Sequence, residues 1–149
     1  MLSPPSSRKA FTLLEVLLVV ALIAILASIV IIAINPSKQI ADTNNAQRSV
    51  DVNTILNGVY QYAIDNDGTL PASITTTPTD ICITDAVSCT SLIDLSVLTD
   101  NGLYLVAMPT DPTGASGNSA GYQIEETDDG RITISAPDAE NGETIQVTR

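Results

Sequence analysis

The side chains that could do chemistry in this chain of 149 residues are few. It contains no His and two Cys, Cys82 and Cys89, so neither a zinc site nor a cysteine–histidine nucleophile pair can be built. Seventeen acidic and six basic residues give a formal net charge of -11, which repels phosphate backbones, and we expect no direct nucleic-acid binding. The composition therefore disfavours a soluble enzyme.

Glu15 is the most unusual acidic residue, because it lies in an apolar run, residues 11–34, in which the other polar side chains are Thr12 and Ser28. A carboxylate at the centre of a membrane span costs about 2.5–3.5 kcal/mol, and less near its edge. One interpretation is an interfacial acid that reaches back to water or to Lys9. The other is an acid that gains a positive partner only when helices assemble.

Cys82 and Cys89 are close enough in the sequence to form a local disulfide, and an oxidising compartment would favour it over two free thiols. Acidic residues in two C-terminal turns could offer oxygen ligands to calcium, and no other cofactor is expected. These calcium candidates are Asp128, Asp129, Asp138 and Glu140. Because they follow no fixed ligand pattern, solvated turn acids are the favoured interpretation.

The apolar run 11–34 is long enough, at about 1.5 Å per residue, to cross a hydrocarbon core of about 30 Å as a helix. Arg8 and Lys9 precede it and acidic residues dominate after it, which predicts a cytoplasmic N-terminus and an external C-terminal part. A cleaved secretory signal is disfavoured, because the run is long and no A-x-A sequence follows it.

A second helical stretch follows. Pro36 either kinks a continuous helix or ends one helix and starts another. We expect one long helix over about 11–66, kinked or locally loosened near Pro36. Its apolar stripe is predicted to be core, and consists of Ile40, Val52, Ile55, Leu56, Val59, Tyr62 and Ala63. Its polar faces are assigned to Asp42, Asn45, Arg48, Asp51 and Asn57.

Three C-terminal segments that alternate apolar and polar residues predict an antiparallel meander over 122–124, 132–136 and 145–147, with turns at 127–130 and 137–142. Residues 74–80 are expected to form an exposed loop. A short helix is expected to open at Ser91, with Asp94 as its capping partner, and to end at Gly102. Packing the meander on the helical stripe gives an α+β domain.

The sequence Lys9-Ala10-Phe11-Thr12-Leu13-Leu14-Glu15-Val16-Leu17 resembles the processing site of type IV prepilins and type II secretion pseudopilins. The shared features are a short basic leader containing Arg8 and Lys9, a small residue, and Phe-Thr-Leu-Leu-Glu opening a long apolar helix. The resemblance implies that prepilin peptidase cuts between Ala10 and Phe11 and methylates the new amine of Phe11. The family usually has Gly before the cut, whereas this chain has Ala10.

The resemblance also implies a pilin fold, with a leader at 1–10, a transmembrane and filament-core helix at 11–34, an amphipathic helix at 35–67 and a head at 68–149. The precursor would sit in the inner membrane and join a homo-oligomeric helical filament, extracellular or periplasmic, through an inner-membrane assembly platform. Glu15 of one subunit would neutralise the Phe11 amine of a neighbour.

We therefore expect a structural subunit of a type IV pilus-like filament and not an enzyme. The segment Pro109-Thr110-Asp111-Pro112 resembles the Pro-x-Asp-Pro segment of major pseudopilins, so a type II secretion pseudopilin is the alternative. A non-polymerising, membrane-anchored binding protein or hydrolase is a further alternative. Roles in adhesion, motility, DNA uptake and secretion all stay open.

Overall fold

The computed structural model describes residues 11–149. The chain forms two compact units, one that extends to Gln39 and one from Ile40 to Arg149. The first unit is dominated by α1 (Leu13–Ile34), whose side chains are apolar apart from Glu15 and Ser28. The Ser28 hydroxyl donates to the Ala24 carbonyl at 2.8 Å, so its polar hydrogen is satisfied within the helix.

The expected single helix is two helices, because α1 ends at Ile34 and α2 (Pro36–Asp65) begins after one residue. Asn35 adopts the left-handed conformation (φ 48°, ψ 78°) that often ends a helix. Pro36 then occupies the first helical position, where the missing amide hydrogen and fixed φ are tolerated. Pro36 therefore begins a new helix and does not kink a continuous one.

In the second unit, α2 ends where Asp67 and Gly68 both have positive φ, 54° and 84°. The Gly68 amide donates to the Ala63 carbonyl at 2.7 Å, which is the bond pattern of a Schellman motif. The predicted helix end near residue 66 is therefore confirmed, and Asp65 is the last helical residue.

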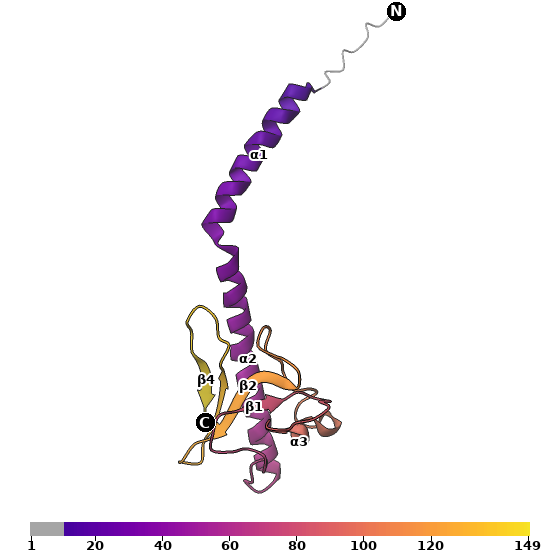
Figure 1. Ribbon diagram of the computed structural model, residues 1–149, viewed down its shortest axis with the longest axis vertical. Helices are drawn as coiled ribbons and strands as arrows, with labels where there is room; N and C mark the ends of the chain where they lie inside the picture. Colours follow the sequence, from indigo (N-terminus) through magenta and orange to yellow (C-terminus); the bar gives the residue numbers. More distant parts are fainter. Residues whose placement is uncertain (1–10) are drawn as a thin grey trace, which may run out of the picture. The chain divides into compact units, whose positions relative to one another are not determined.

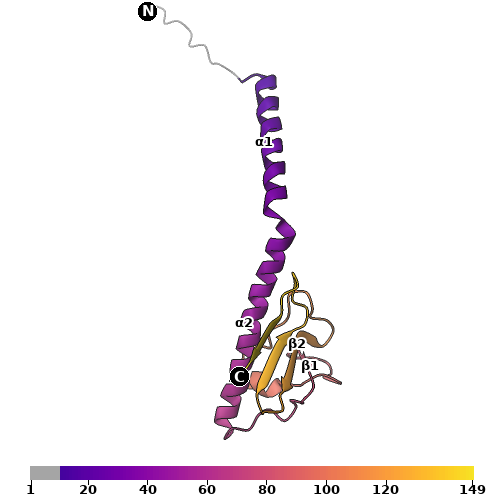
Figure 2. The same cartoon turned by 90° about the vertical axis from the view of Figure 1, so that its left-hand side faces the viewer.

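A four-stranded antiparallel sheet packs on α2, with strand order β1-β2-β3-β4 (Figures 1 and 2). The strands are β1 (Thr79–Cys82), β2 (Ser119–Glu126), β3 (Ile132–Ala136) and β4 (Ile145–Thr148). The three predicted strands are present and pair in meander order, with Ile124 opposite Ile134 and Ile134 opposite Val147. The expected α+β class is confirmed.

The first strand, β1, was not predicted, because residues 74–80 read as a Thr-rich loop. Thr79 and Asp80 instead pair with Ile124 and Gln123 of β2. The strand is short, and its other edge makes a parallel bridge between Ile81 and Ile93. Partners distant in the sequence therefore stabilise a segment whose own pattern is weak.

The short helix also begins later than expected. Ser91 lies outside any helix with φ 63°, and α3 (Ser96–Thr99) is followed by the 3₁₀ turn η1 (Asp100–Gly102). Asp94 accepts a hydrogen bond from the Ser96 amide at 2.9 Å. Asp94 therefore stabilises the start of α3 through this local hydrogen bond. It does not act as the partner of a cap at Ser91.

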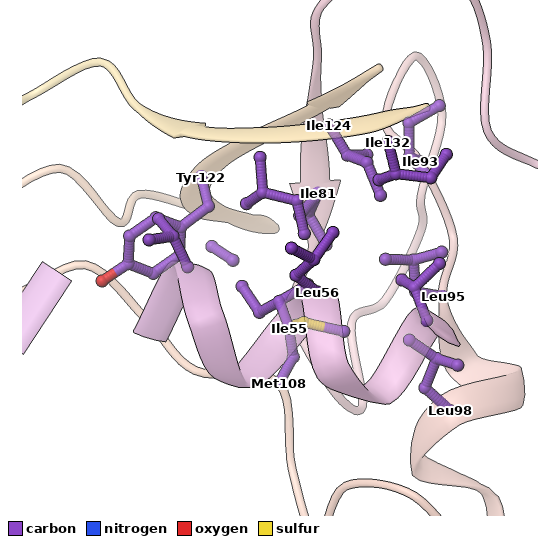
Figure 3. Close-up of a cluster of buried hydrophobic side chains, with 14 of the residues drawn as sticks. Ile55, Leu56, Ile81, Ile93, Leu95, Leu98, Met108, Tyr122, Ile124 and Ile132 are labelled. Carbon is purple, nitrogen blue, oxygen red and sulfur yellow. The ribbon is translucent and has the colours of Figure 1, made fainter. Parts of the chain in front are cut away.

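The core of the second unit lies between α2 and the sheet, and Figure 3 shows Ile55 and Leu56 of α2 facing Tyr122, Ile124 and Ile132. Loop and α3 residues close the open side of this core, chiefly Leu95, Leu98 and Met108. The predicted stripe is buried at Val52, Ile55, Leu56, Val59 and Ala63, and Tyr62 packs against it. Ile40 is an error of the prediction, since its side chain is 62% exposed.

Cys82 and Cys89 form a disulfide with an S–S distance of 2.06 Å. The bond ties the end of β1 to the loop that follows it, and the Asn118 side chain holds that loop by donating to the Ser88 carbonyl at 2.7 Å. Of the two alternatives open from the sequence, the structure has the disulfide.

Replacing both cysteines by Ser is expected to lower the free energy of unfolding by about 2 kcal/mol, because a short cross-link restricts the unfolded chain. Chemical denaturation of the full chain in detergent, with and without reductant, would measure the effect. Reductant should destabilise the native chain and leave the double Ser variant unchanged. Equal stability of all forms would contradict the expectation.

Candidate functional site

The described part of the predicted processing site is the start of α1. Phe11 precedes the helix and is 81% exposed, and Thr12 is the N-cap residue, whose hydroxyl oxygen accepts from the Glu15 amide at 3.2 Å. Arg8, Lys9 and Ala10 lie outside the described residues. The cap fixes the first helical turn next to Phe11.

Glu15 lies in that first turn, with its side chain exposed. An acidic side chain is favourable there, because the free amides of a helix N-terminus carry partial positive charge. Phe11 lies four residues before Glu15, a spacing of about one helical turn.

No residue of α1 is buried, although its mean hydropathy is 3.4. The helix is long and apolar enough to cross a membrane, by length and composition. Large apolar side chains exposed over a whole helix mark a surface that lipid or other helices must cover. The described residues therefore leave the apolar surface of α1 uncovered.

A second site, in the other unit, was missed from the sequence and centres on Arg48. Its side chain is fully buried and pairs in two-pronged geometry with Asp111: Nε lies 2.6 Å from Oδ2 and Nη2 lies 2.9 Å from Oδ1. Nη1 also donates to Glu140 Oε2 at 2.9 Å, and Nη2 to the Thr113 hydroxyl at 2.6 Å. Such paired hydrogen bonds are the strong form of an Arg–carboxylate contact.

The partners of Arg48 come from two loops far from it in the sequence. Asp111 caps its own loop by accepting from the Thr113 and Gly114 amides at 2.9 and 2.7 Å. The backbone of Glu140 is held by Asn45, which donates to the Glu140 carbonyl and accepts from its amide, both at 2.9 Å. One guanidinium on α2 therefore ties down loops 109–114 and 137–142.

The close approach of loop 109–114 to β2 requires glycine at position 121. Gly121 has φ 81°, and a Cβ placed there would lie 2.6 Å from Cβ of Asp111. A side chain at this position would therefore displace the carboxylate from Arg48 and strain the backbone.

The network also shifts proton affinities. Burial by itself raises the pKa of Asp111, but the hydrogen bonds from Arg48 and from the Thr113 and Gly114 amides outweigh it and leave that pKa lowered. Hydrogen bonds from Arg48 and Asn44 lower the pKa of Glu140. The hydrogen bond to Asp111 is the main reason that the pKa of Arg48 is raised. The cluster is thus charged at neutral pH.

A second buried bond extends the cluster. Tyr122 is fully buried, and its hydroxyl donates to Asp51 Oδ2 at 2.7 Å. Burial and this bond raise the pKa of Tyr122, so the phenol keeps its proton and remains a donor.

The assignment of Asn45, Arg48 and Asp51 to the polar faces of the helix was wrong, since all three are buried. Their spacing gave the signal: Asn45 and Arg48 continue the stripe of Val52 and Ile55 at steps of three and four. Their polarity masked it, because charged residues are seldom fully buried unless they are paired.

The four calcium candidates do not come together. Asp129 pairs with Arg131 at 3.2 Å and Glu140 with Arg48, while Asp128 and Asp138 are exposed turn residues. Within residues 11–149, no group of three or more His, Cys, Asp or Glu could hold a metal ion. The acids at Glu140 and Asp129 serve instead as ion-pair partners.

We expect the Arg48 cluster to make the fold acid-sensitive. The pKa of Asp111 is lower in the folded chain than in the unfolded one, so its carboxylate stabilises the fold above the unfolded value of about 3.9. This contribution is lost as the pH falls through the folded pKa. Asp111→Asn should cost about 3 kcal/mol at pH 7, and the difference from the native chain should shrink at acid pH.

Denaturant unfolding of the native chain and of Asp111→Asn, in detergent between about pH 2 and 7, would measure this. The two free energies of unfolding should converge as the pH falls. Thr76→Ala, in an exposed loop, serves as the control and should follow the native curve at every pH. A constant gap between native chain and Asp111→Asn would contradict the assignment of the pH dependence to Asp111.

Residues 5–34 match the family model of the prokaryotic N-terminal methylation motif. No curated protein matches the chain, and neither does any solved structure. The matched segment includes Phe11, the Thr12 cap, Glu15 and all of α1. The chain thus carries a prokaryotic N-terminal methylation motif at its N-terminus, as type IV pilins and pseudopilins do.

Proposed function

We propose that this protein is a structural subunit of a type IV pilus-like filament. The observation that carries the proposal is the methylation motif at 5–34 on a helix with no buried residue. Prepilin peptidase removes residues 1–10 and methylates the amine of Phe11. The precursor spans the inner membrane once, and the mature chain enters an extracellular or periplasmic filament through an inner-membrane assembly platform.

In the filament, α1 exchanges lipid for the helices of neighbouring subunits, so its apolar surface stays out of water throughout. Cleavage creates a positive amine at Phe11, one turn before Glu15. The carboxylate of one subunit then meets the amine of the next, and each charge offsets the cost of burying the other. The pair is unavailable before cleavage, which makes processing a switch for assembly.

A pseudopilin of a type II secretion system is the second candidate. It is favoured by the segment 109–112, whose Asp111 is not a surface residue but the partner of Arg48. The segment thus has a structural role in the head that either kind of filament could use. A hydrolase is the less supported alternative, since the motif points to a structural subunit.

Processing and polymerisation can be tested together on material sheared from cells that express the chain. Mass spectrometry is expected to find filaments whose subunits begin at N-methylated Phe11. Membranes from cells without prepilin peptidase should hold the chain from Met1, and no filaments. Filaments built of uncut chains, or a processed chain that never polymerises, would refute the proposed function.

Glu15→Ala is expected to be cut normally and yet to polymerise poorly, with filament yield down by about tenfold or more, since the buried amine of the neighbour loses its counter-charge. Immunoblots of sheared and membrane fractions would separate cutting from assembly. Glu15→Asp keeps the charge and should recover part of the yield. A normal filament yield from Glu15→Ala would show that the charge pair does not drive assembly.

A further inference from the structure

The second unit has a hollow beside the disulfide, with a volume of about 580 Å³. It lies between residues 82–89, residues 94–101 and Met108, and we call it the α3 hollow. Its apolar lining includes Leu95 and Met108, which also belong to the core in Figure 3. A volume of this size falls in the range of ligand sites, about 300–1,000 Å³.

The disulfide and hydrogen bonds hold the walls of the α3 hollow in place. Thr84 accepts from the Met108 amide at 2.7 Å, which joins two of the walls. The Cys82 amide donates to the Ile93 carbonyl at 2.9 Å, which joins the end of β1 to the segment before α3. A ligand that enters a hollow formed in this way does not have to order its walls.

Three carboxylates line the α3 hollow, those of Asp85, Asp94 and Asp100. No basic residue within 11–149 lines it, and the three arginines of the second unit bond to residues elsewhere. Asp94 accepts from the Ser96 amide at 2.9 Å. The Asp85 carboxylate has no hydrogen-bond or ion-pair partner among the described residues. The hollow therefore has negative charge that the second unit does not neutralise.

Apolar side chains are exposed in the same segments. Val97 of α3 lines the hollow and is 43% exposed. Val87, in the loop closed by the disulfide, is 97% exposed, and Val106, two residues before Met108, is 90% exposed. A surface of carboxylates and apolar side chains suits a Lys side chain, which has an aliphatic stem and a charged end.

We propose that the α3 hollow binds a basic segment of a partner protein. A Lys side chain of the partner enters the hollow, with its stem along Leu95 and Met108 and its ammonium group donating to the carboxylates. Apolar neighbours of that Lys cover Val87 and Val106. This inference goes beyond the proposed function and does not depend on polymerisation.

Charge and shape favour this occupant over others. Anionic ligands, nucleic acids included, are repelled by the three carboxylates. A metal ion needs ligands that converge, and no group of three or more His, Cys, Asp or Glu within residues 11–149 could hold one. A small amine would pair with the carboxylates but leave Val87 and Val106 in water. A basic protein segment satisfies both kinds of group.

The test measures fluorescence anisotropy of a short labelled peptide that alternates Val and Lys, with the full-length chain in non-ionic detergent. We expect binding that weakens as the ionic strength rises. Asp85→Asn and Asp94→Asn should each weaken it by about threefold, the effect of one exposed ion pair. Both variants should fold, because Asn tolerates the left-handed conformation of Asp85 (φ 59°) and its side-chain oxygen still accepts from the Ser96 amide at position 94.

Asp67→Asn is the matched control, because Asp67 is also exposed, has a positive φ of 54° and lies outside the α3 hollow. Its affinity for the peptide should equal that of the native chain. A loss equal to that of Asp85→Asn would show general attraction to the acidic head and would overturn the inference. Thermal melts check folding, and Asp100→Asn replaces Asp85→Asn if that variant melts early.

The same peptide with acetylated lysines should not bind, because acetylation removes the charge. Equal binding of the acetylated peptide, or no binding of either peptide, would overturn the inference. Spermidine that binds as tightly as the peptide would also overturn it, in favour of a site for small amines. None of these measurements uses filaments, so their failure would leave the proposed function standing.

Discussion

The guanidinium of Arg48 joins parts of the head that the order of the chain keeps far apart. It sits on α2 and holds Asp111 in one loop and Glu140 in another. A buried ion pair of this kind adds little net stability over an apolar pair, but removing one partner leaves a charge buried and unpaired. The pair therefore favours one position of each loop, since a loop that moves away leaves Arg48 buried without its carboxylate. Its position on α2 is what fixes the loops around the sheet.

Charge is divided unevenly between the two units, and the division suits the proposed assembly. The first helix keeps Glu15 as its one charged side chain, whereas the second unit contains all the other acidic residues of the chain. Acidic heads remain soluble and repel unwanted association. Uncharged helical surfaces then become the places where copies can meet at low electrostatic cost.

The sequence-based predictions succeeded where a feature depends on residues close together in the sequence, and they failed where it depends on distant ones. The apolar run, the interruption at Pro36 and the helix end near residue 66 depend on neighbours within a few residues. They could therefore be recognised from the sequence. Arg48 was misplaced, because its apolar spacing was outweighed by its charge and its partner Asp111 lies far along the chain. The strand β1 was missed for a similar reason, since β2 and Ile93 supply the bonds that make it a strand.

The sequence by itself determined the kind of N-terminus this protein has. A processing motif and a membrane-length apolar helix are written in consecutive residues, and they need no tertiary contact to be read. Only the tertiary structure decided which polar residues of α2 are buried and that Cys82 and Cys89 are joined. Burial is a property of what packs against a side chain, and a periodic pattern cannot say whether a distant carboxylate will arrive to pair with a buried cation.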